Sequence, residues 1–290
     1  MALKVFKQSM LLLALGFIGD LGRAQFVVTT GLDEIANLRP GESKRFAIGV
    51  TNTGGEARTA SIRFVDHQVI DGGNQFLEPG KLERSLANWL ITRPSVSLEP
   101  GESITLFVDV QVPSNVNNGG TYWGVLLIEP DEATQATEVA DVNRERGEGE
   151  DVTIHFRYRI RTAIQLVVNL PGNEKPQIEL RDPVVTRTPE GTIELRVAIA
   201  NEGGRWARSS TLNLDVYEAQ TGSKVMSSER SVARLYPGSN RHATFDMGHL
   251  ESGRYQLVLL AEVAGDVVAA TRFDLDVEPQ HPSPGPEGAP

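Results

Sequence analysis

The chain contains no cysteine among its 290 residues. Exported β-domains are often cross-linked by disulfides, so the sheets of a chain without cysteine must be held together by packing alone. The absence also leaves no cysteine after the N-terminal apolar run to carry a lipid anchor. A chain of this length suits two domains of about 100 to 130 residues with additional ends.

Long hydrophobic runs are scarce as well. The N-terminal apolar run, Met10 to Ile18, has nine residues, whereas a membrane-spanning helix needs about 20. Lys4 and Lys7 precede this run and Gly22-Arg23-Ala24 follows it as a small-x-small cleavage site, so residues 1–24 are predicted to be a secretory signal peptide. An uncleaved N-terminal anchor is the alternative. No later stretch is apolar enough to span a membrane, so the mature chain is expected in the periplasm or at the cell surface.

Positive charge is in short supply: lysine and arginine number 28 against 38 acidic residues, and the formal net charge is −10. Proteins that bind nucleic acid neutralise phosphates with basic residues, so nucleic acid is not an expected partner. The segment 129–151 holds nine acidic residues and two arginines and is predicted to be a solvated loop. It lacks the ligand spacing of a calcium loop, so no metal site is predicted there.

Catalytic motifs are missing too. The chain has neither His-Glu-x-x-His nor Gly-x-Ser-x-Gly, and its five histidines, at 67, 155, 242, 249 and 281, do not have metal-ligand spacing. We therefore expect no catalytic residues, no metal and no cofactor, in a protein that is not an enzyme.

Most of the chain consists of short alternating segments separated by turn residues, without a helical period. Asn52-Thr53-Gly54-Gly55 follows an early segment of the first half, and Asn201-Glu202-Gly203-Gly204 occupies the same place in the second half. The repetition predicts an all-β fold of two immunoglobulin-like β-sandwich domains in tandem.

The composition also indicates the domain bounds. Proline and glycine around charged residues mark an exposed linker at 171–176. The predicted domains are residues 25–171, which include the acidic loop 129–151, and residues 177–278. The proline-rich tail 279–290 is predicted to be disordered.

The segment from Val152 to Leu170 has the strongest pattern. Every even-numbered position except Thr162 is apolar, as in a β-strand with one buried face. The pattern predicts one long strand that closes the first domain and carries the chain toward the second. The odd-numbered positions include a basic stripe of His155, Arg157, Arg159 and Arg161.

Two motifs precede this segment. Leu98-Glu99-Pro100-Gly101-Glu102-Ser103 leads into a hydrophobic strand, and Tyr122 to Pro130 (YWGVLLIEP) leads into the acidic loop and the alternating strand that ends at Pro171. With these motifs, residues 26–170 resemble the N-terminal immunoglobulin-like domain of periplasmic pilus chaperones, the PapD-like superfamily. The second half resembles a generic bacterial immunoglobulin-like or fibronectin-like domain. Tyr122 and Trp123 are expected to be core residues.

The resemblance implies a function. In PapD-like chaperones, the strand after the loop is lent to an incomplete pilin subunit, and a basic residue in that strand helps to hold the subunit's C-terminal carboxylate. By position, Arg159 or Arg161 would take this role. The family's other anchoring arginine lies in the first strand, where this chain has Phe26 to Thr30 and no basic residue.

The alternating strand is therefore the predicted partner-binding site. The predicted residues are Ile154, Phe156, Tyr158, Ile160, Arg157, Arg159 and Arg161. The alternative for the arginines is that charges on an edge strand prevent aggregation. The expected function is that of a chaperone-like assembly factor, which binds an exported pilin-like or surface subunit by β-strand pairing. The alternative is a structural or adhesive surface module that stays in the assembly.

Overall fold

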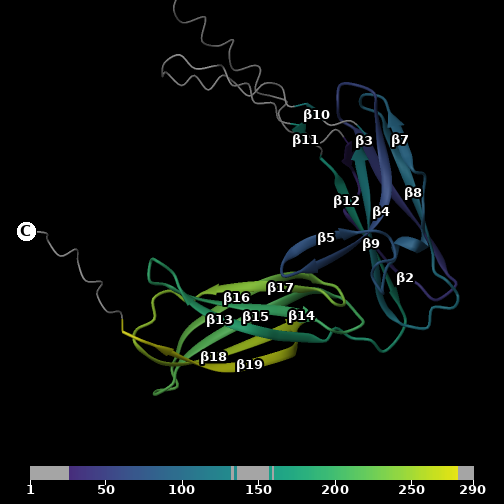
Figure 1. The fold of residues 1–290 in the computed structure, drawn as a ribbon. Coiled ribbons are helices and arrows are strands. Elements are labelled where there is room, and N and C mark those ends of the chain that lie inside the picture. The colour runs from purple at the N-terminus through teal and green to yellow at the C-terminus, as the bar shows by residue number, and fades with distance from the viewer. Residues whose placement is uncertain (1–25, 132–133, 136–156, 159, 280–290) are drawn as a thin grey trace, which may run out of the picture.

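The structure, a computed structural model, describes residues 26–131, 134–135, 157–158 and 160–279 (Figure 1). The predicted signal peptide, most of the predicted acidic loop and nearly all of the predicted tail lie outside the described residues. Figure 1 shows two β-sandwiches that meet at an angle. The prediction of an all-β fold with two sandwiches is confirmed, and the described residues contain no α-helix.

The first domain consists of two main sheets. One sheet has the order β1 (Phe26–Val28), β3 (Ser43–Asn52), β8 (Ser103–Gln111) and β6 (Leu90–Ile91). The other has the order β2 (Asp33–Asn37), β12 (Thr162–Leu170), β9 (Gly120–Pro130), β4 (Arg58–Ile70) and β5 (Gly73–Leu77), and β7 (Ser95–Leu98) also pairs with β4. A 3₁₀ turn, η1, covers Ala87–Trp89, and β10 (Thr134–Gln135) pairs with β11 (Arg157–Tyr158).

The core of this domain follows from strand alternation. Phe46, Ile48 and Val50 of β3 are buried, while the residues between them are exposed or half-buried. Side chains of a strand point alternately to its two faces, so one face of β3 packs against the other sheet. Every residue of β9, which lies between β12 and β4 in the sheet, is buried.

The second domain is built in the same way. One sheet has the order β13 (Ile178–Arg187), β14 (Ile193–Asn201) and β17 (Asn240–Asp246). The other has the order β16 (Lys224–Leu235), β15 (Ala207–Glu218), β18 (Gly253–Val263) and β19 (Asp266–Val277). Leu195, Leu214 and Phe245 lie fully buried between them.

A buried asparagine fixes a turn of the first domain. Asn52 has no exposed surface. Its Nδ2 donates to the carbonyls of Glu56 and Leu98 at 2.8 and 3.0 Å, and its Oδ1 accepts from the N–H of Gly54 at 2.9 Å. Its own carbonyl accepts from the N–H of Gly101 at 2.9 Å, which connects the turn to the Pro-Gly turn before β8. One amide therefore satisfies several buried backbone groups.

The second domain repeats this arrangement at Asn201. Nδ2 of this buried side chain donates to the carbonyls of Arg205 and Leu235 at 2.8 and 3.0 Å. Its Oδ1 accepts from the N–H groups of Gly203 and Gln177 at 3.0 and 3.1 Å. The recurrence of Asn-x-Gly-Gly in the sequence thus marks the same turn in both sandwiches.

The predicted long strand is shorter in the structure. β12 begins at Thr162, and Ile160 and Arg161 lie outside any strand. The last pair with β9 is Thr162 with Ile128, and β9 ends at Pro130, which has no N–H to continue the ladder. The predicted buried face of the strand is confirmed for its described part. Its buried residues are Ile164, Leu166, Val168 and Leu170.

Candidate functional site

The strand β12 has one edge that is only partly covered. β2 runs parallel to β12 and pairs with Gln165 to Asn169. Among the described residues, Thr162 to Ile164 pair only with β9, so no strand lies along their other side. We call this uncovered side of Thr162 to Ile164 the open edge.

The alternation of main-chain groups decides which residue the open edge presents. The N–H of Gln165 donates to the carbonyl of Leu32 at 2.8 Å, on the side away from β9. Main-chain groups alternate along a strand, so the N–H and carbonyl of Ala163 point to that same side. Ala163 is exposed and can therefore pair with an additional strand.

Apolar side chains lie beside the open edge. Here the chain crosses from β1 in one sheet to β2 in the other, and the hydroxyl of Thr162 lies 3.5 Å from the carbonyl of Phe26. Val27 in β1 is 39% exposed, and Leu32 in the crossing segment is 54% exposed. An extended segment bound to the open edge would find apolar surface next to it.

Two arginines gather on one carboxylate at the start of β12. Nε of Arg161 lies 2.7 Å from Glu129 Oε1, and Nε of Arg63 lies 2.6 Å from Glu129 Oε2. The side chain of Glu129 is 8% exposed, whereas the two arginine side chains are about half exposed. The hydrogen bond with Glu129 raises the pKa of Arg63 above its usual value. Arginine presents several donors in a planar fork, so this cluster suits a second carboxylate.

The structure describes only some of the predicted site residues. Ile160 is half-buried, and Arg161 joins the carboxylate cluster beside the open edge. Arg157 and Tyr158 form β11, and the structure describes their backbone only. Ile154, Phe156 and Arg159 lie outside the described residues altogether, so their roles stay predictions.

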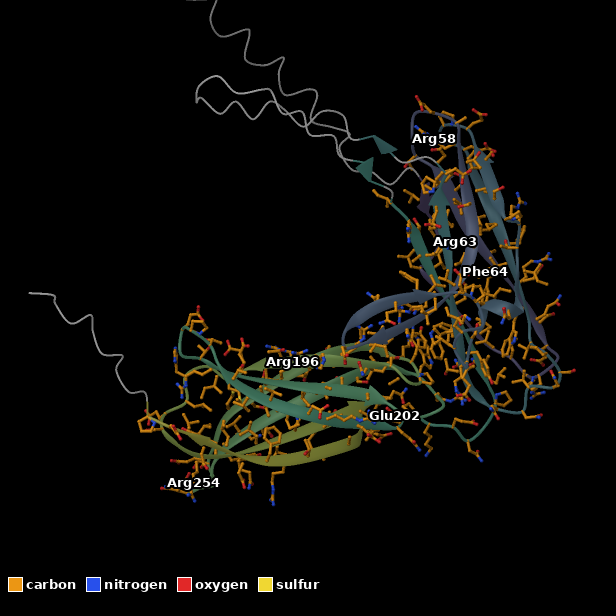
Figure 2. The ribbon with its side chains drawn as sticks, in the orientation of Figure 1. Arg58, Arg63, Phe64, Arg196, Glu202 and Arg254 are labelled. Carbon is orange, nitrogen blue, oxygen red and sulfur yellow. The ribbon has the colours of Figure 1, made fainter. Side chains whose placement is uncertain are left out.

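The sequence did not reveal Glu129 and Arg63 as part of this site. The composition places Glu129 at the start of the predicted solvated loop, but Glu129 is a buried residue of β9. The available signal was alternation, because Glu129 follows Val125 and Leu127 on the same face of the strand. Arg63, labelled in Figure 2, belongs to the neighbouring β4, where it pairs with Leu127.

The two domains meet at an aromatic stack. The ring of Tyr236 lies between Trp123 of the first domain and Trp206, at centroid distances of 4.7 and 5.4 Å. Burial raises the pKa of the Tyr236 hydroxyl well above its usual value. The prediction that Tyr122 and Trp123 are core residues is confirmed by their burial, although Trp123 faces the second domain.

Main-chain contacts complete this joint. The N–H of Thr121 donates to the carbonyl of Gly204 at 3.0 Å. Arg205 donates to the carbonyls of Leu170 and Glu174 at 3.0 and 3.1 Å. We call the stack and these contacts the domain joint. It holds the second domain against the start of β9 and the C-terminal end of β12.

The β4–β5 hairpin adds a further contact between the domains (Figure 1). The N–H of Asp71, at the tip of the hairpin, donates to Oδ1 of Asn240 in β17. Nearer its base, the carbonyl of His67 accepts from the indole N–H of Trp123 at 2.6 Å. Burial lowers the pKa of His67, which favours its neutral form.

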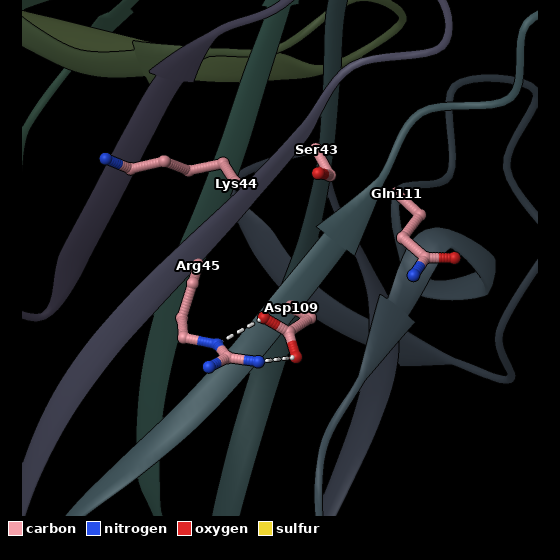
Figure 3. Close-up of a pocket in the computed structure, with 5 residues that line it drawn as sticks. All are labelled: Ser43, Lys44, Arg45, Asp109 and Gln111. Carbon is pink, nitrogen blue, oxygen red and sulfur yellow. Dashed lines mark hydrogen bonds and ion pairs between the residues drawn. The ribbon is translucent and has the colours of Figure 1, made fainter.

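A surface depression lies in the first domain, away from the open edge. Figure 3 shows this depression of about 390 Å³ between β3 and β8. Arg45 there binds Asp109 through two nitrogens, at 2.7 and 2.9 Å, so the two charges satisfy each other. Within the described ranges, no group of three acidic or histidine side chains could hold a metal ion. The same residues include no helix with the length and apolarity to cross a membrane.

No protein-family model matches the chain, and no curated protein matches it either. Solved structures do match. The class 5 fimbrial chaperone CfaA is 12% identical with a TM-score of 0.41, over 88% of this chain and 100% of its own. A chain of the CsuC–CsuE chaperone–tip adhesion subunit pre-assembly complex of Acinetobacter baumannii is 16% identical with a TM-score of 0.41, over 78% and 92%. The CupB2 chaperone of Pseudomonas aeruginosa is 14% identical with a TM-score of 0.35, over 87% and 100%.

The chain is thus similar to chaperones of solved structure over most of its length, at low sequence identity. This is the likeness that the sequence motifs predicted for the first half. At such identities it is a likeness of fold and not of individual site residues. The more specific resemblance of the second half to a fibronectin-like domain stays a prediction.

Proposed function

We propose that this chain is an exported, non-enzymatic protein that binds another exported polypeptide by β-strand pairing, as a chaperone-like assembly factor for pilus or surface subunits. The observation that carries the proposal is the open edge of β12. The pairing of β12 with β2 begins only at Gln165, so Ala163 is left exposed and, among the described residues, without a partner strand on the side away from β9. Main-chain hydrogen bonds along such an edge supply affinity, and neighbouring side chains supply specificity. The proposed place of action is the periplasm or the cell surface.

The cluster of Arg63, Glu129 and Arg161 supports the same proposal. It lies at the end of β12 from which a partner strand would extend, and its two arginines are half exposed. A carboxylate of the partner would fix the register of pairing there.

A structural or adhesive module that stays in its assembly is the second candidate. The observation in its favour is on β19, an edge strand of the second domain, where Val267 is 57% and Val268 39% exposed. Apolar edge strands are typical sites of strand addition. Cell fractionation separates the two candidates, because a chaperone leaves its client and a module remains in the finished surface layer or fibre.

Replacing Ala163 with proline is expected to reduce partner capture at least about tenfold, because it removes the main-chain donor on the open edge and places a ring there. Stability should change little, since this N–H points away from β9. Capture is measured by co-purification with the tagged mature protein and quantitative mass spectrometry, per folded molecule. Ala163→Val keeps the N–H and is the matched control. Equal capture by the proline and valine variants would refute pairing at this edge.

Replacing both Ile154 and Phe156 with threonine is expected to weaken capture while the monomer stays folded. These side chains are predicted to fill the partner's groove when the strand pairs with it. Capture and thermal unfolding should be measured on the same preparation. Unfolding of the variant with unchanged capture per folded molecule would mean that these residues are ordinary core, and the module candidate would then lead.

Arg161→Ala is expected to weaken capture roughly threefold at low salt and less at high salt, because the lost contact is a partly exposed ion pair. Arg254→Ala is the control: Arg254 makes an exposed contact of 3.4 Å with Asp276 at the far end of the second domain (Figure 2). The same salt-dependent loss in both variants would assign the effect to net charge and not to the cluster.

A further inference from the structure

One side chain of the second domain reaches the end of the open edge. Arg234, near the end of β16, contacts Oε1 of Gln165 and Oδ2 of Asp33 through its two terminal nitrogens. Gln165 and Asp33 are register partners and form the first pair of the β2–β12 ladder. We call these two contacts the Arg234 bridge. The bridge thus spans both strands at the pair where the open edge ends.

The second domain fixes the position of this arginine. Arg234 lies two residues before Tyr236, whose ring is held in the aromatic stack of the domain joint. The carbonyl of Arg234 also accepts from Nε of Arg241 at 3.4 Å. The guanidinium is therefore placed by the second domain, while both of its acceptors belong to the first.

The ladder that the bridge holds is weak by itself. β2 has five residues, lies at the edge of its sheet and pairs in parallel, which is slightly less stable per residue than antiparallel pairing. The residues that precede β2, Thr29 to Leu32, are exposed and lie in no strand. Without a contact at Asp33, fraying of β2 would start at this end and would uncover Gln165.

We infer that Arg234 is a positioning residue that holds β2 on β12 at the Asp33–Gln165 pair and so sets how much of the edge a partner strand can use. The inference rests on the proposed function for its biological meaning. It gives the second domain a part in binding without contact to the partner, because the Arg234 bridge decides where the open edge ends.

Hydrogen exchange on the free protein tests the bridge directly. The N–H of Gln165, bonded to the Leu32 carbonyl at 2.8 Å, reports on the bridged end of the ladder. The N–H of Leu38, bonded to the Asn169 carbonyl at 3.1 Å, reports on the other end. In Arg234→Ala the Gln165 amide is expected to exchange about tenfold faster, as for the loss of one charge-assisted hydrogen bond, while the Leu38 amide changes less than about twofold.

Two further variants separate positioning from general destabilisation. Asn240→Ala removes the acceptor of the Asp71 N–H at the hairpin contact and should leave the Gln165 amide unchanged. The exchanged pair Asp33→Arg with Arg234→Asp should restore slow exchange at Gln165. Equal acceleration of the Gln165 and Leu38 amides, or no acceleration at Gln165, would overturn the inference. Because exchange needs no partner, a failed capture test with Ala163→Pro would contradict the proposed function and leave the exchange result standing.

Discussion

Replacing Gly120 with alanine is expected to break the domain joint and to lower the free energy of unfolding by about 3 kcal/mol. Gly120 has a φ of +97°, and a Cβ there would lie 2.1 Å from the carbonyl oxygen of Gly204 and 2.9 Å from Arg84 Nη1. The first of these atoms is backbone of the second domain and cannot move aside as a flexible side chain can. The domains should therefore separate, which small-angle scattering detects as a larger maximum dimension and urea denaturation as lost stability.

Gly222→Ala is the matched control for this variant. Gly222 also has a positive φ, +68°, but an added Cβ would meet no atom within 4 Å. It should cost only the backbone strain of a left-handed residue, about 1 kcal/mol. Equal losses in the two variants, with unchanged dimensions, would show that the Gly120 contact does not hold the domains together.

Replacing Asn201 with alanine is expected to destabilise the second domain by about 3 kcal/mol, because buried backbone groups lose their partners and each such group costs about 1 kcal/mol or more. The groups are the carbonyls of Arg205 and Leu235 and the N–H groups of Gly203 and Gln177. Differential scanning calorimetry is suited to this measurement, since it resolves a transition of one domain from that of the other.

Asn213→Ala is the control in the same domain. Its Nδ2 donates at 2.9 Å to a half-buried carboxylate, Glu262, which can turn to water when the amide is lost. The expected cost is below about 1 kcal/mol. An Asn201→Ala variant that loses no more stability than Asn213→Ala would contradict the role of the buried amide.

The sequence predicted the strands well because alternation is a local property of the chain. The even-numbered residues of β12, such as Leu166 and Val168, are buried as the pattern required. The recurring Asn-x-Gly-Gly motif likewise predicted a shared turn. The motif could not indicate why the asparagine recurs. Asn52 and Asn201 donate to the carbonyls of Leu98 and Leu235, which are far away in the chain.

The site was predicted only in part, for two physical reasons. Alternation assigns a side chain to a face but does not say what covers that face, so the contact of Trp123 with Tyr236 across the domain joint had no local signal. The length of a strand depends on its neighbour, so the start of β12 at Thr162 depends on Pro130 in β9 and not on the β12 sequence. The family resemblance implies Arg159 or Arg161 as the carboxylate ligand, but it gives no indication of Glu129, the intramolecular partner of Arg161.

The continuous strand β4 connects the sheet of the first domain mechanically to the second domain. Its 13 residues, about 40 Å at the usual rise, pair with β9 from Ala60 to Val65 and then form the hairpin that contacts Asn240. β4 continues from the part that pairs with β9 into the part that pairs with β5, without a break that could act as a hinge. A torque applied to the second domain at the hairpin tip is therefore transmitted along β4 into β9, the neighbour of β12. We therefore expect bending at the corner between the domains to twist the sheet that carries the open edge.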